Sequence, residues 1–346
     1  MKNTELIPDP FEKARLEKGY GEMDDEQDSV VMVLRHKDVR KCAHNWKTFQ
    51  SGAEPGRIVV PSEVNIRDIR QIPFEVDPPE HKEYRALMED WFRRPLKPDY
   101  EAALKVQINA AVEVALNQDT VEAVEGFSLP LQSRALTLLL NVPYSEAETW
   151  IGWGVHVFRS EESKTDASKA NILFDYLDEK IEEAEAHKGG NLYSVLLNSE
   201  YKGRLLTKEE VKGAMMLTFA GGRDTIINYV TNTLAYLAYN PKALDRLRKE
   251  PELIGKAVEE LVRYFTPLTH MGRVVTEDAQ VCSHAIKADE RISLCWASAN
   301  RDAAVFENPN EVILDRKVNP HVAFGFSHHK CLGQHHARQI MKVLLQ

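Results

Sequence analysis

The chain has 346 residues, a length that fits one large domain or two ordinary ones. Its 53 acidic and 44 basic residues give a formal charge of −9, which argues against non-specific binding to nucleic acid or to anionic membranes. Four cysteines without a Cys-x-x-Cys pair argue against a disulfide framework, and no apolar run indicates a signal peptide or a membrane span. We therefore expect a globular cytoplasmic protein.

Helical patterns dominate the predicted elements. In chain order, β-branched runs predict strands at 29–35, 271–282 and 290–298, and apolar residues at helical spacing predict helices at 101–118, 174–190, 207–241 and 241–267. The third helix begins with a capping box at Thr207 and ends before Pro241, and the fourth is split at Pro251. The sequence shows no internal repeat. It predicts a mainly α fold with a small β region, arranged as a single domain over residues 1–346.

The segment HHKCLGQHH (328–336) holds one cysteine among four histidines, which suggests a metal site. A structural zinc site needs four ligands, and adjacent helical residues such as His335 and His336 point about 100° apart, so they cannot both face one ion. A three-ligand zinc site remains an alternative, and so does a cysteine buried in a glycine-containing turn. A haem thiolate fits better, because its iron takes a single protein ligand, a cysteine.

The residues around Cys331 have the properties that a haem thiolate requires. The thiolate needs a turn that lets the backbone approach the porphyrin, an aromatic shield, and a following helix whose N-terminus stabilises negative charge. Phe324, Gly325 and the helical segment after Gly333 supply these parts. The segment resembles the cytochrome P450 signature, Phe-Gly-x-Gly-x-His/Arg-x-Cys-x-Gly, at Phe324, Gly325, His329, Cys331 and Gly333. Ser327 stands where the family usually has glycine, and we expect its turn conformation to carry some strain.

The longest helical pattern is interrupted by AGGRDT (220–225). Two adjacent glycines cost about 2 kcal/mol relative to alanines in a helix interior, so a kink or a close ligand approach is expected there. The resemblance extends to this helix, where the family has Ala/Gly-Gly-x-Asp/Glu-Thr, here Ala220, Gly221 or Gly222, Asp224 and Thr225. It implies that Asp224 and Thr225 relay protons. The alternative is helix packing at small residues, with Asp224 in an ordinary salt bridge.

Two further groups of charged residues match the family. Glu260 and Arg263 lie on one helix face, and the resemblance implies a buried structural network of these two residues with Arg316. It also implies four residues that bind the two haem propionates as cations. These are His81, Arg85, Arg273 and His329. Each would otherwise be a solvated surface charge.

The resemblance implies a haem-thiolate monooxygenase that holds haem b (iron protoporphyrin IX), with Cys331 as the metal ligand and Gly221 against the cofactor. It implies O2 and electrons from a ferredoxin and a ferredoxin reductase, with no nucleic-acid or membrane partner. We expect the ferredoxin to bind a basic patch made of Arg93, Arg94, Lys97, Lys330, His335 and Arg338. His328 and His336 are expected at the same surface. The family usually continues after its last helix into a β-hairpin, which the printed sequence does not reach.

The substrate is predicted from polar residues that line the pocket by family analogy. Segment 50–77 carries Arg57, Glu63, Asn65, Arg67 and Asp68, and further candidates are Thr218, Thr269 and His270. Because terpene and fatty-acid pockets are normally more apolar, we expect a small, oxygen-bearing substrate. Oxidative O-demethylation of a methylated sugar or a methoxyarene, releasing formaldehyde, fits. The alternatives are that these residues face solvent, that a terpenoid or fatty acid is hydroxylated, or that the protein is a non-catalytic haem sensor.

Overall fold

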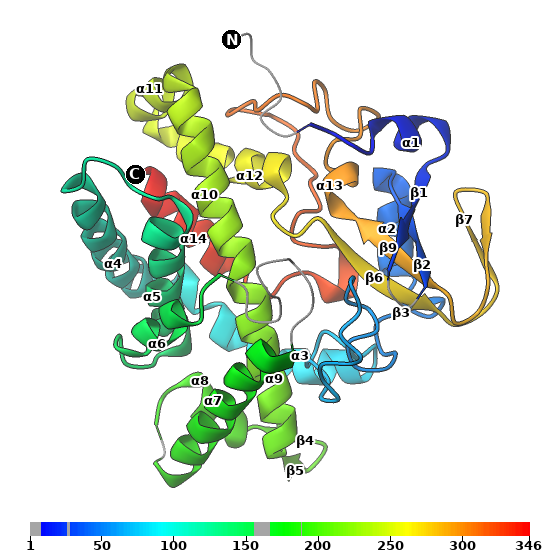
Figure 1. Ribbon diagram of the computed structural model, residues 1–346, viewed down its shortest axis with the longest axis horizontal. Helices are drawn as coiled ribbons and strands as arrows, with labels where there is room; N and C mark the ends of the chain where they lie inside the picture. The colour runs from blue at the N-terminus through cyan, green and yellow to red at the C-terminus, as the bar shows by residue number, and fades with distance from the viewer. Residues whose placement is uncertain (1–7, 26–27, 156–166, 188) are drawn as a thin grey trace. The chain divides into compact units, whose positions relative to one another are not determined.

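The computed structural model describes residues 8–25, 28–155, 167–187 and 189–346 (Figure 1). The chain divides into two compact units, each built from separate stretches of sequence. The first unit contains Met1–Asp68, Phe74–Pro78 and Ala235–Cys331, and the second contains Ile69–Pro73, Pro79–Leu234 and Leu332–Gln346. The prediction of a mainly α chain with a small β region is confirmed. No helix of the described residues is long and apolar enough to cross a membrane.

The first unit combines a sheet with short helices. Its strands are β1 (Tyr20–Asp24), β2 (Ser29–Val33), β3 (Phe49–Gln50), β6 (His270–Val275), β7 (Ala279–Val281), β8 (His284–Ile286) and β9 (Arg291–Cys295). Its helices are α1 (Glu12–Glu17), α2 (His36–His44), α11 (Pro241–Lys249), α12 (Ile254–Phe265) and α13 (Trp296–Ala299), with 3-10 turns η3 (Pro251–Leu253) and η4 (Ser327–His329). Five strands form one sheet in the order β1-β2-β9-β6-β3. The β2–β9 pair is parallel, and the other pairs are antiparallel.

The core of the first unit lies where this sheet packs against α2. All five residues of β9 are buried, as expected for a strand covered on both faces. Ile292 and Leu294 of this strand share one hydrophobic cluster with Val33 of β2 and Val39 of α2. Strand β6 pairs with β9 and places Arg273 opposite Ile292. The core therefore fixes the strand that carries two of the predicted site residues, His270 and Arg273.

The second unit is almost entirely helical. Its elements are α3 (Glu80–Phe92), η1 (Arg94–Leu96), α4 (Pro98–Leu116), the π-helical turn η2 (Val124–Ser128), α5 (Leu129–Leu140), α6 (Glu146–Gly152), α7 (Ala167–Ala186), α8 (Leu192–Leu197), the hairpin β4 (Glu200–Tyr201) and β5 (Arg204–Leu205), α9 (Lys208–Gly222), the first part of α10 (Asp224–Tyr239), and α14 (Gln334–Leu345). Helix α9 begins with the predicted capping box, in which Thr207 and Glu210 satisfy each other's backbone N–H groups. It ends at the predicted interruption.

A close approach inside the first unit gives a prediction for Gly272 of β6. The Gly272 N–H donates to the Ile58 carbonyl at 2.9 Å. A Cβ atom on Gly272 would lie 2.5 Å from the same oxygen, so one of the two backbones must move. We expect Gly272→Ala to lower the free energy of unfolding by about 1–3 kcal/mol and to loosen the segment around Ile58. Thermal denaturation and limited proteolysis would measure both effects.

The matched control for Gly272→Ala is Gly255→Ala. A Cβ atom on Gly255 of α12 would meet nothing within 4 Å, and alanine favours a helix by up to about 1 kcal/mol. We expect Gly255→Ala to leave stability unchanged or slightly raised. Equal effects of the two variants would contradict the close approach at Ile58.

Candidate active site

Cys331 ends a loop of the first unit that has two left-handed turns. The turns lie at Gly325 (φ +72°) and Ser327 (φ +65°). The Cys331 N–H donates to the Phe324 carbonyl at 2.8 Å, which closes the loop. The Cys331 side chain is exposed. The chain passes through Gly333, which precedes α14 as its N-cap.

Ser327 adopts the left-handed conformation that glycine would adopt with less strain. For a residue with a side chain this costs roughly 1–2 kcal/mol. The Ser327 hydroxyl lies 2.9 Å from Nδ1 of His44 in α2, and the His44 ring stacks on His328. The Arg40 guanidinium of α2 lies over the Phe326 ring, 4.3 Å from its centroid. Helix α2 therefore contacts three consecutive residues before the cysteine.

These contacts give opposite expectations for two substitutions of Ser327. Ser327→Ala removes the hydrogen bond to His44 but keeps the strain, so we expect a loss of about 1 kcal/mol of stability. Ser327→Gly removes both the hydrogen bond and the backbone strain. Relief of the strain stabilises the folded state, but the greater freedom of glycine in the unfolded chain offsets that stabilisation. We therefore expect the free energy of unfolding to change by less than about 0.5 kcal/mol. Thermal denaturation would measure both. An alanine variant as stable as the glycine variant would contradict this explanation.

His329 and Arg273 lie together in the first unit, around a carboxylate that the sequence patterns do not reveal. The Asp77 carboxylate lies 3.5 Å from His329 Nε2 and accepts hydrogen bonds from the N–H groups of Ser51 and Gly52. Burial raises the pKa of Asp77, but these hydrogen bonds more than offset it and hold the pKa below its ordinary value. Burial lowers the pKa of His329 to about 4, with a further lowering by Arg273. Burial therefore favours the neutral ring, and the role of His329 as a cation at a propionate stays a prediction.

Arg273 provides a test of whether this region suits a haem. Its side chain is 3% exposed, and its hydrogen bond within the described residues goes to the adjacent Gly272 carbonyl at 2.6 Å. Burial lowers its pKa to about 10, partly offset by the charge of Asp77, so the guanidinium remains charged near pH 7. A buried cation bonded to its own neighbour's carbonyl retains donors for an anion. The first unit thus combines a cation suited to a carboxylate such as a propionate with an exposed thiol on a turned loop, so these residues fit a haem.

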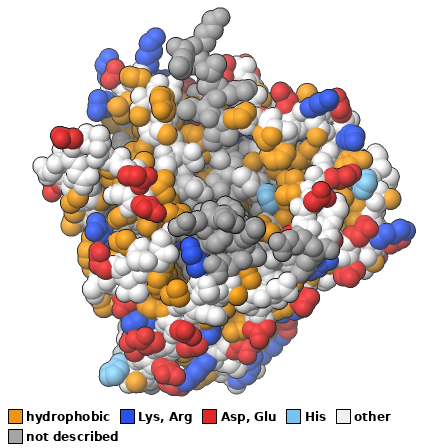
Figure 2. Space-filling view, viewed as in Figure 1, with side chains coloured by type: hydrophobic (Ala, Val, Ile, Leu, Met, Phe, Trp, Pro, Cys, Tyr) orange, Lys and Arg blue, Asp and Glu red, His pale blue; other side chains and the backbone are white. Residues whose placement is uncertain are grey.

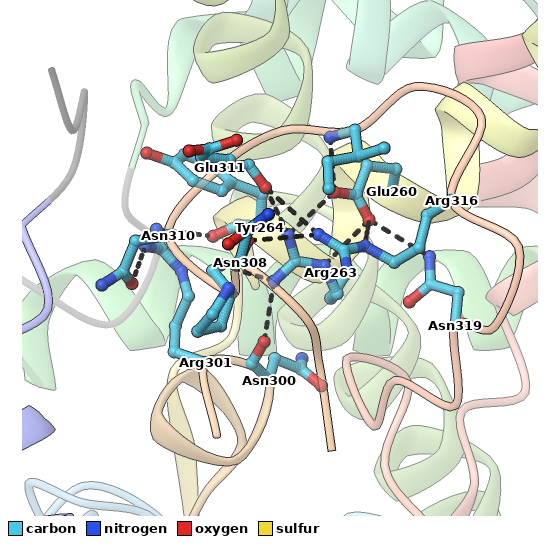
Figure 3. A network of polar contacts seen from close by, with 12 residues as sticks. Glu260, Arg263, Tyr264, Asn300, Arg301, Asn308, Asn310, Glu311, Arg316 and Asn319 are labelled. Carbon is cyan, nitrogen blue, oxygen red and sulfur yellow. Dashed lines mark hydrogen bonds and ion pairs between the residues drawn. The ribbon is translucent and has the colours of Figure 1, made fainter. Parts of the chain in front are cut away.

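Glu260, Arg263 and Arg316 form one buried network in the first unit (Figure 3). Both Glu260 oxygens accept from Arg263 at 2.8 Å, and one also accepts from Arg316 Nε at 2.8 Å. The Ile313 N–H donates to the other oxygen at 2.8 Å. Arg263 also donates to the carbonyls of residues 300, 309 and 311. The network joins α12 to the loop before the cysteine segment, which is the structural arrangement expected from the sequence.

The second unit contains the interruption between α9 and α10. Arg223 is the non-helical residue between the helices (φ −97°, ψ −80°). Asp224 begins α10, and the Thr225 hydroxyl donates to the Gly221 carbonyl at 2.7 Å. Gly221 is exposed, and a Cβ atom there would meet nothing within 4 Å. Gly221 therefore lies beside open space, whereas a Cβ atom on Gly222 would lie 3.8 Å from a Leu136 side-chain carbon. Thr218 is buried, and its hydroxyl donates to the Ala214 carbonyl at 2.9 Å.

His81 and Arg85 are one turn apart on α3 in the second unit. The His81 side chain is buried, and Arg85 is half-buried.

The predicted substrate residues Thr269 and His270 lie in the first unit. The Thr269 carbonyl accepts from the Ala297 N–H at 3.0 Å, and His270 Nδ1 lies 3.1 Å from the Ser293 hydroxyl. Thr269 is exposed and His270 half-buried. The roles predicted for His81, Arg85, Thr269 and His270 stay predictions.

The family model for Cytochrome P450 matches residues 155–346. Linalool 8-monooxygenase of Pseudomonas putida is 29% identical, over 99% of this chain and 88% of its own. Pentalenic acid synthase of Streptomyces avermitilis is 32% identical, over 81% of this chain and 70% of its own. A solved structure described as a carbohydrate active P450 is 70% identical, with a TM-score of 0.97 over 100% of this chain and 90% of that chain. The chain belongs to the cytochrome P450 family.

The relationship confirms the predicted P450 fold and the enzyme class. Cytochrome P450 enzymes are monooxygenases that bind haem iron, so this P450 is an oxidoreductase of that class. Bacterial P450s receive electrons from separate redox partners such as ferredoxins. The signature loop and the interrupted helix described above lie within the matched residues.

The charged side chains of segment 50–77 differ from the predicted substrate-facing arrangement. Arg67 donates to Glu63 at 2.8 Å and to both oxygens of Glu75 at 2.7 and 2.8 Å, and all three side chains are buried. Arg57 pairs with Asp28 at 2.8 Å. Asn65 and Asp68 are exposed. Much of the polarity of this segment thus serves ion pairs within the first unit of the P450, so it does not support an oxygen-bearing substrate.

Two residues of the predicted ferredoxin surface are less exposed than expected: His336 is buried and Arg94 is half-buried. His336 is 4% exposed, and its Nδ1 lies 2.9 Å from the Tyr100 hydroxyl, so the prediction of a surface residue is wrong. Burial lowers the pKa of His336 to about 3. Arg94 donates to the Leu139 carbonyl at 3.1 Å, which restrains its guanidinium.

The remaining charges of that predicted surface differ in their exposure. Arg93, Lys97 and Lys330 are exposed, whereas His335 and Arg338 are half-buried. On the face shown in Figure 2, acidic and basic side chains are interspersed. The six-residue basic patch stays a prediction.

Proposed function

We propose that this P450 removes the methyl group of an O-methylated carbohydrate. The main support for this proposal is that the chain is 70% identical, over its whole length, to the structure described as a carbohydrate active P450. Inserting one oxygen atom of O2 into a methyl C–H bond uses two electrons and two protons and releases the second oxygen atom as water. The product is a hemiacetal, which breaks down to the free hydroxyl and formaldehyde.

The chain's own residues hold the haem b in this proposal. Cys331 is the thiolate ligand, and the closed loop with its turns at Gly325 and Ser327 presents the sulfur. The propionates are held by four residues, with His329 acting as a neutral hydrogen-bond donor. These are His81, Arg85, Arg273 and His329. The bound haem thiolate supplies oxygen activation, favoured by electron donation from the sulfur.

Three other residues are proposed to contact the cofactor, and one buried network supports its loop. Gly221 offers an open surface without a side chain, and Phe324 and Gly333 flank the cysteine segment. The buried Glu260 network keeps that segment in place.

Asp224 and Thr225 deliver protons at the interruption between α9 and α10. The Thr225 hydroxyl gives its proton to the hydrogen bond with the Gly221 carbonyl, so its oxygen lone pairs are available to accept from water. Asp224 is the adjacent acid that exchanges protons with the solvent. Thr218, Thr269 and His270 are proposed substrate contacts. The proposed electron donors are a ferredoxin and a ferredoxin reductase. We also propose that residues 1–346 form one P450 domain.

A second candidate is hydroxylation of a terpenoid such as linalool. Its support is the relative named linalool 8-monooxygenase, which is 29% identical. The lower identity makes this relative weaker support than the carbohydrate active P450.

Formaldehyde release tests the proposal and separates the two candidates. The haem-loaded protein would be given NADPH, a ferredoxin and its reductase with O-methylated hexoses, a methoxyarene or linalool. We expect formaldehyde from at least one methylated hexose, in equal amount to the demethylated sugar. Hydroxylation of linalool without formaldehyde from any hexose would reject the proposal. The Cys331→Ala protein supplies the blank.

A further inference from the structure

A buried arginine lies at the interruption between α9 and α10. Arg223 is the residue between the glycines and Asp224, and its side chain is 1% exposed. Its position corresponds to the variable x in the Gly-x-Asp-Thr pattern. Burying a guanidinium costs free energy, so contacts of the Arg223 side chain must offset the loss of its hydration.

The Arg223 guanidinium contacts the C-terminal end of α6 in the same unit. Nη1 donates to the Trp150 carbonyl at 2.9 Å, and Nη2 donates to the Gly154 carbonyl. Its central carbon lies 5.7 Å from the centroid of the Trp153 ring. The last carbonyls of a helix carry partial negative charge, so the cation caps α6. Among the described residues its Nε–H is buried without a hydrogen-bond partner, so capping leaves one donor unsatisfied.

The backbone of Arg223 is also where the hydrogen bonds of α10 begin. The N–H groups of Ile226 and Ile227 both donate to the Arg223 carbonyl at 3.0 Å. On the α9 side, Gln132 of α5 donates to the Gly222 carbonyl at 3.0 Å, and Thr225 donates to the Gly221 carbonyl. Three successive carbonyls at the interruption therefore have specified donors. The first hydrogen bonds of α10 thus start at the Arg223 carbonyl, directly before Asp224 and Thr225.

We propose that Arg223 is a positioning residue for Asp224 and Thr225. Its side chain fixes the interruption to the end of α6, and its backbone fixes the start of α10. The orientation of the acid and the alcohol thus depends on contacts with α6. This inference rests on the proposed function, which gives Asp224 and Thr225 their role in proton delivery.

The test compares three substitutions in the haem-loaded protein. Arg223→Met keeps the length of the side chain and removes the charge and donors, and Arg223→Lys keeps the charge and one donor group. The control is Arg134→Met. Arg134 of α5 also contacts α6, through an ion pair with Glu148 at 3.5 Å, but the Glu148 side chain is 64% exposed. The first measurement is hydrogen–deuterium exchange of the amides at 150–154 and 224–227. The second is the fraction of NADPH recovered as hydrogen peroxide during turnover with an O-methylated hexose, compared with Thr225→Ala.

We expect Arg223→Met to raise exchange about tenfold at both segments and to raise the peroxide fraction towards that of Thr225→Ala. Arg223→Lys should lie between Arg223→Met and the unmodified protein, and Arg134→Met should match the unmodified protein. Faster exchange at 150–154 alone, with an unchanged peroxide fraction, would overturn the inference, because Arg223 would then only cap α6. The exchange measurement needs no substrate, so it shows whether Arg223 holds the start of α10 even if no hexose yields formaldehyde. If Arg223→Met does not fold, Arg223→Lys carries the comparison, and unchanged exchange at 224–227 in that variant would overturn the inference.

Discussion

Replacing Cys331 with alanine is expected to abolish the reduced-CO absorption band of a thiolate-ligated haem. Turnover should fall by on the order of 10³-fold or more, since the proposed iron ligand is lost. No other cysteine is a ready substitute, because burial raises the pKa of Cys42, Cys282 and Cys295 to about 12 and keeps them as thiols. The CO difference spectrum of the variant, with haem content measured separately, checks this expectation.

The control for Cys331→Ala is Cys42→Ala. Cys42 is 3% exposed in the core beside the sheet, so its loss removes packing but no ligand. We expect the CO band to persist with a modestly lower melting temperature. An unchanged band in Cys331→Ala would mean that another residue ligates the iron.

Replacing Glu260 with glutamine is expected to cost about 3–5 kcal/mol of stability. The substitution leaves the buried guanidinium groups of Arg263 and Arg316 without their carboxylate. An amide also cannot accept from both arginines and from the Ile313 N–H in the same geometry. Chemical denaturation would measure the loss, and a lower haem content after purification would show its effect on the cysteine segment.

The preceding residue of the same helix supplies the control. Glu259 pairs with His321 at 3.0 Å and is 33% exposed, so Glu259→Gln should cost less than about 1 kcal/mol. If Glu260→Gln does not fold, Arg316→Lys gives a milder test, because lysine keeps the charge but loses the planar donor group. Similar small losses in Glu260→Gln and Glu259→Gln would contradict a structural role for the network.

The sequence predicts the long amphipathic helices well and the buried ones poorly. Apolar spacing locates α4 and α7 to within several residues, and the double glycine locates the interruption after α9. Helix α5 is not predicted, because nine of its 12 residues are buried and the apolar residues therefore show no single face. The run 271–282 merges two strands, since the turn between β6 and β7 carries no glycine or proline.

The residues of the candidate site also differ in how well the sequence predicts them. Motifs identify residues whose chemistry depends on their own type and spacing, such as Cys331 with its turn. They do not identify partners that the fold brings together. Asp77 meets His329 across 252 positions, and Arg67 meets Glu75 inside a segment whose charges resemble a polar pocket wall. The motif does not identify Arg223, because it leaves this position variable. Only the structure shows that the Arg223 side chain is buried.

Oxidative O-demethylation can be followed directly with a hexose whose O-methyl carbon is labelled with ¹³C. The haem-loaded protein, its redox partners and NADPH would be incubated with this sugar under O2, and the products followed by NMR. We expect the label to appear as formaldehyde, in equal amount to the demethylated sugar. Label that stays in an intact methyl ether, while a new hydroxyl appears elsewhere on the sugar, would contradict it.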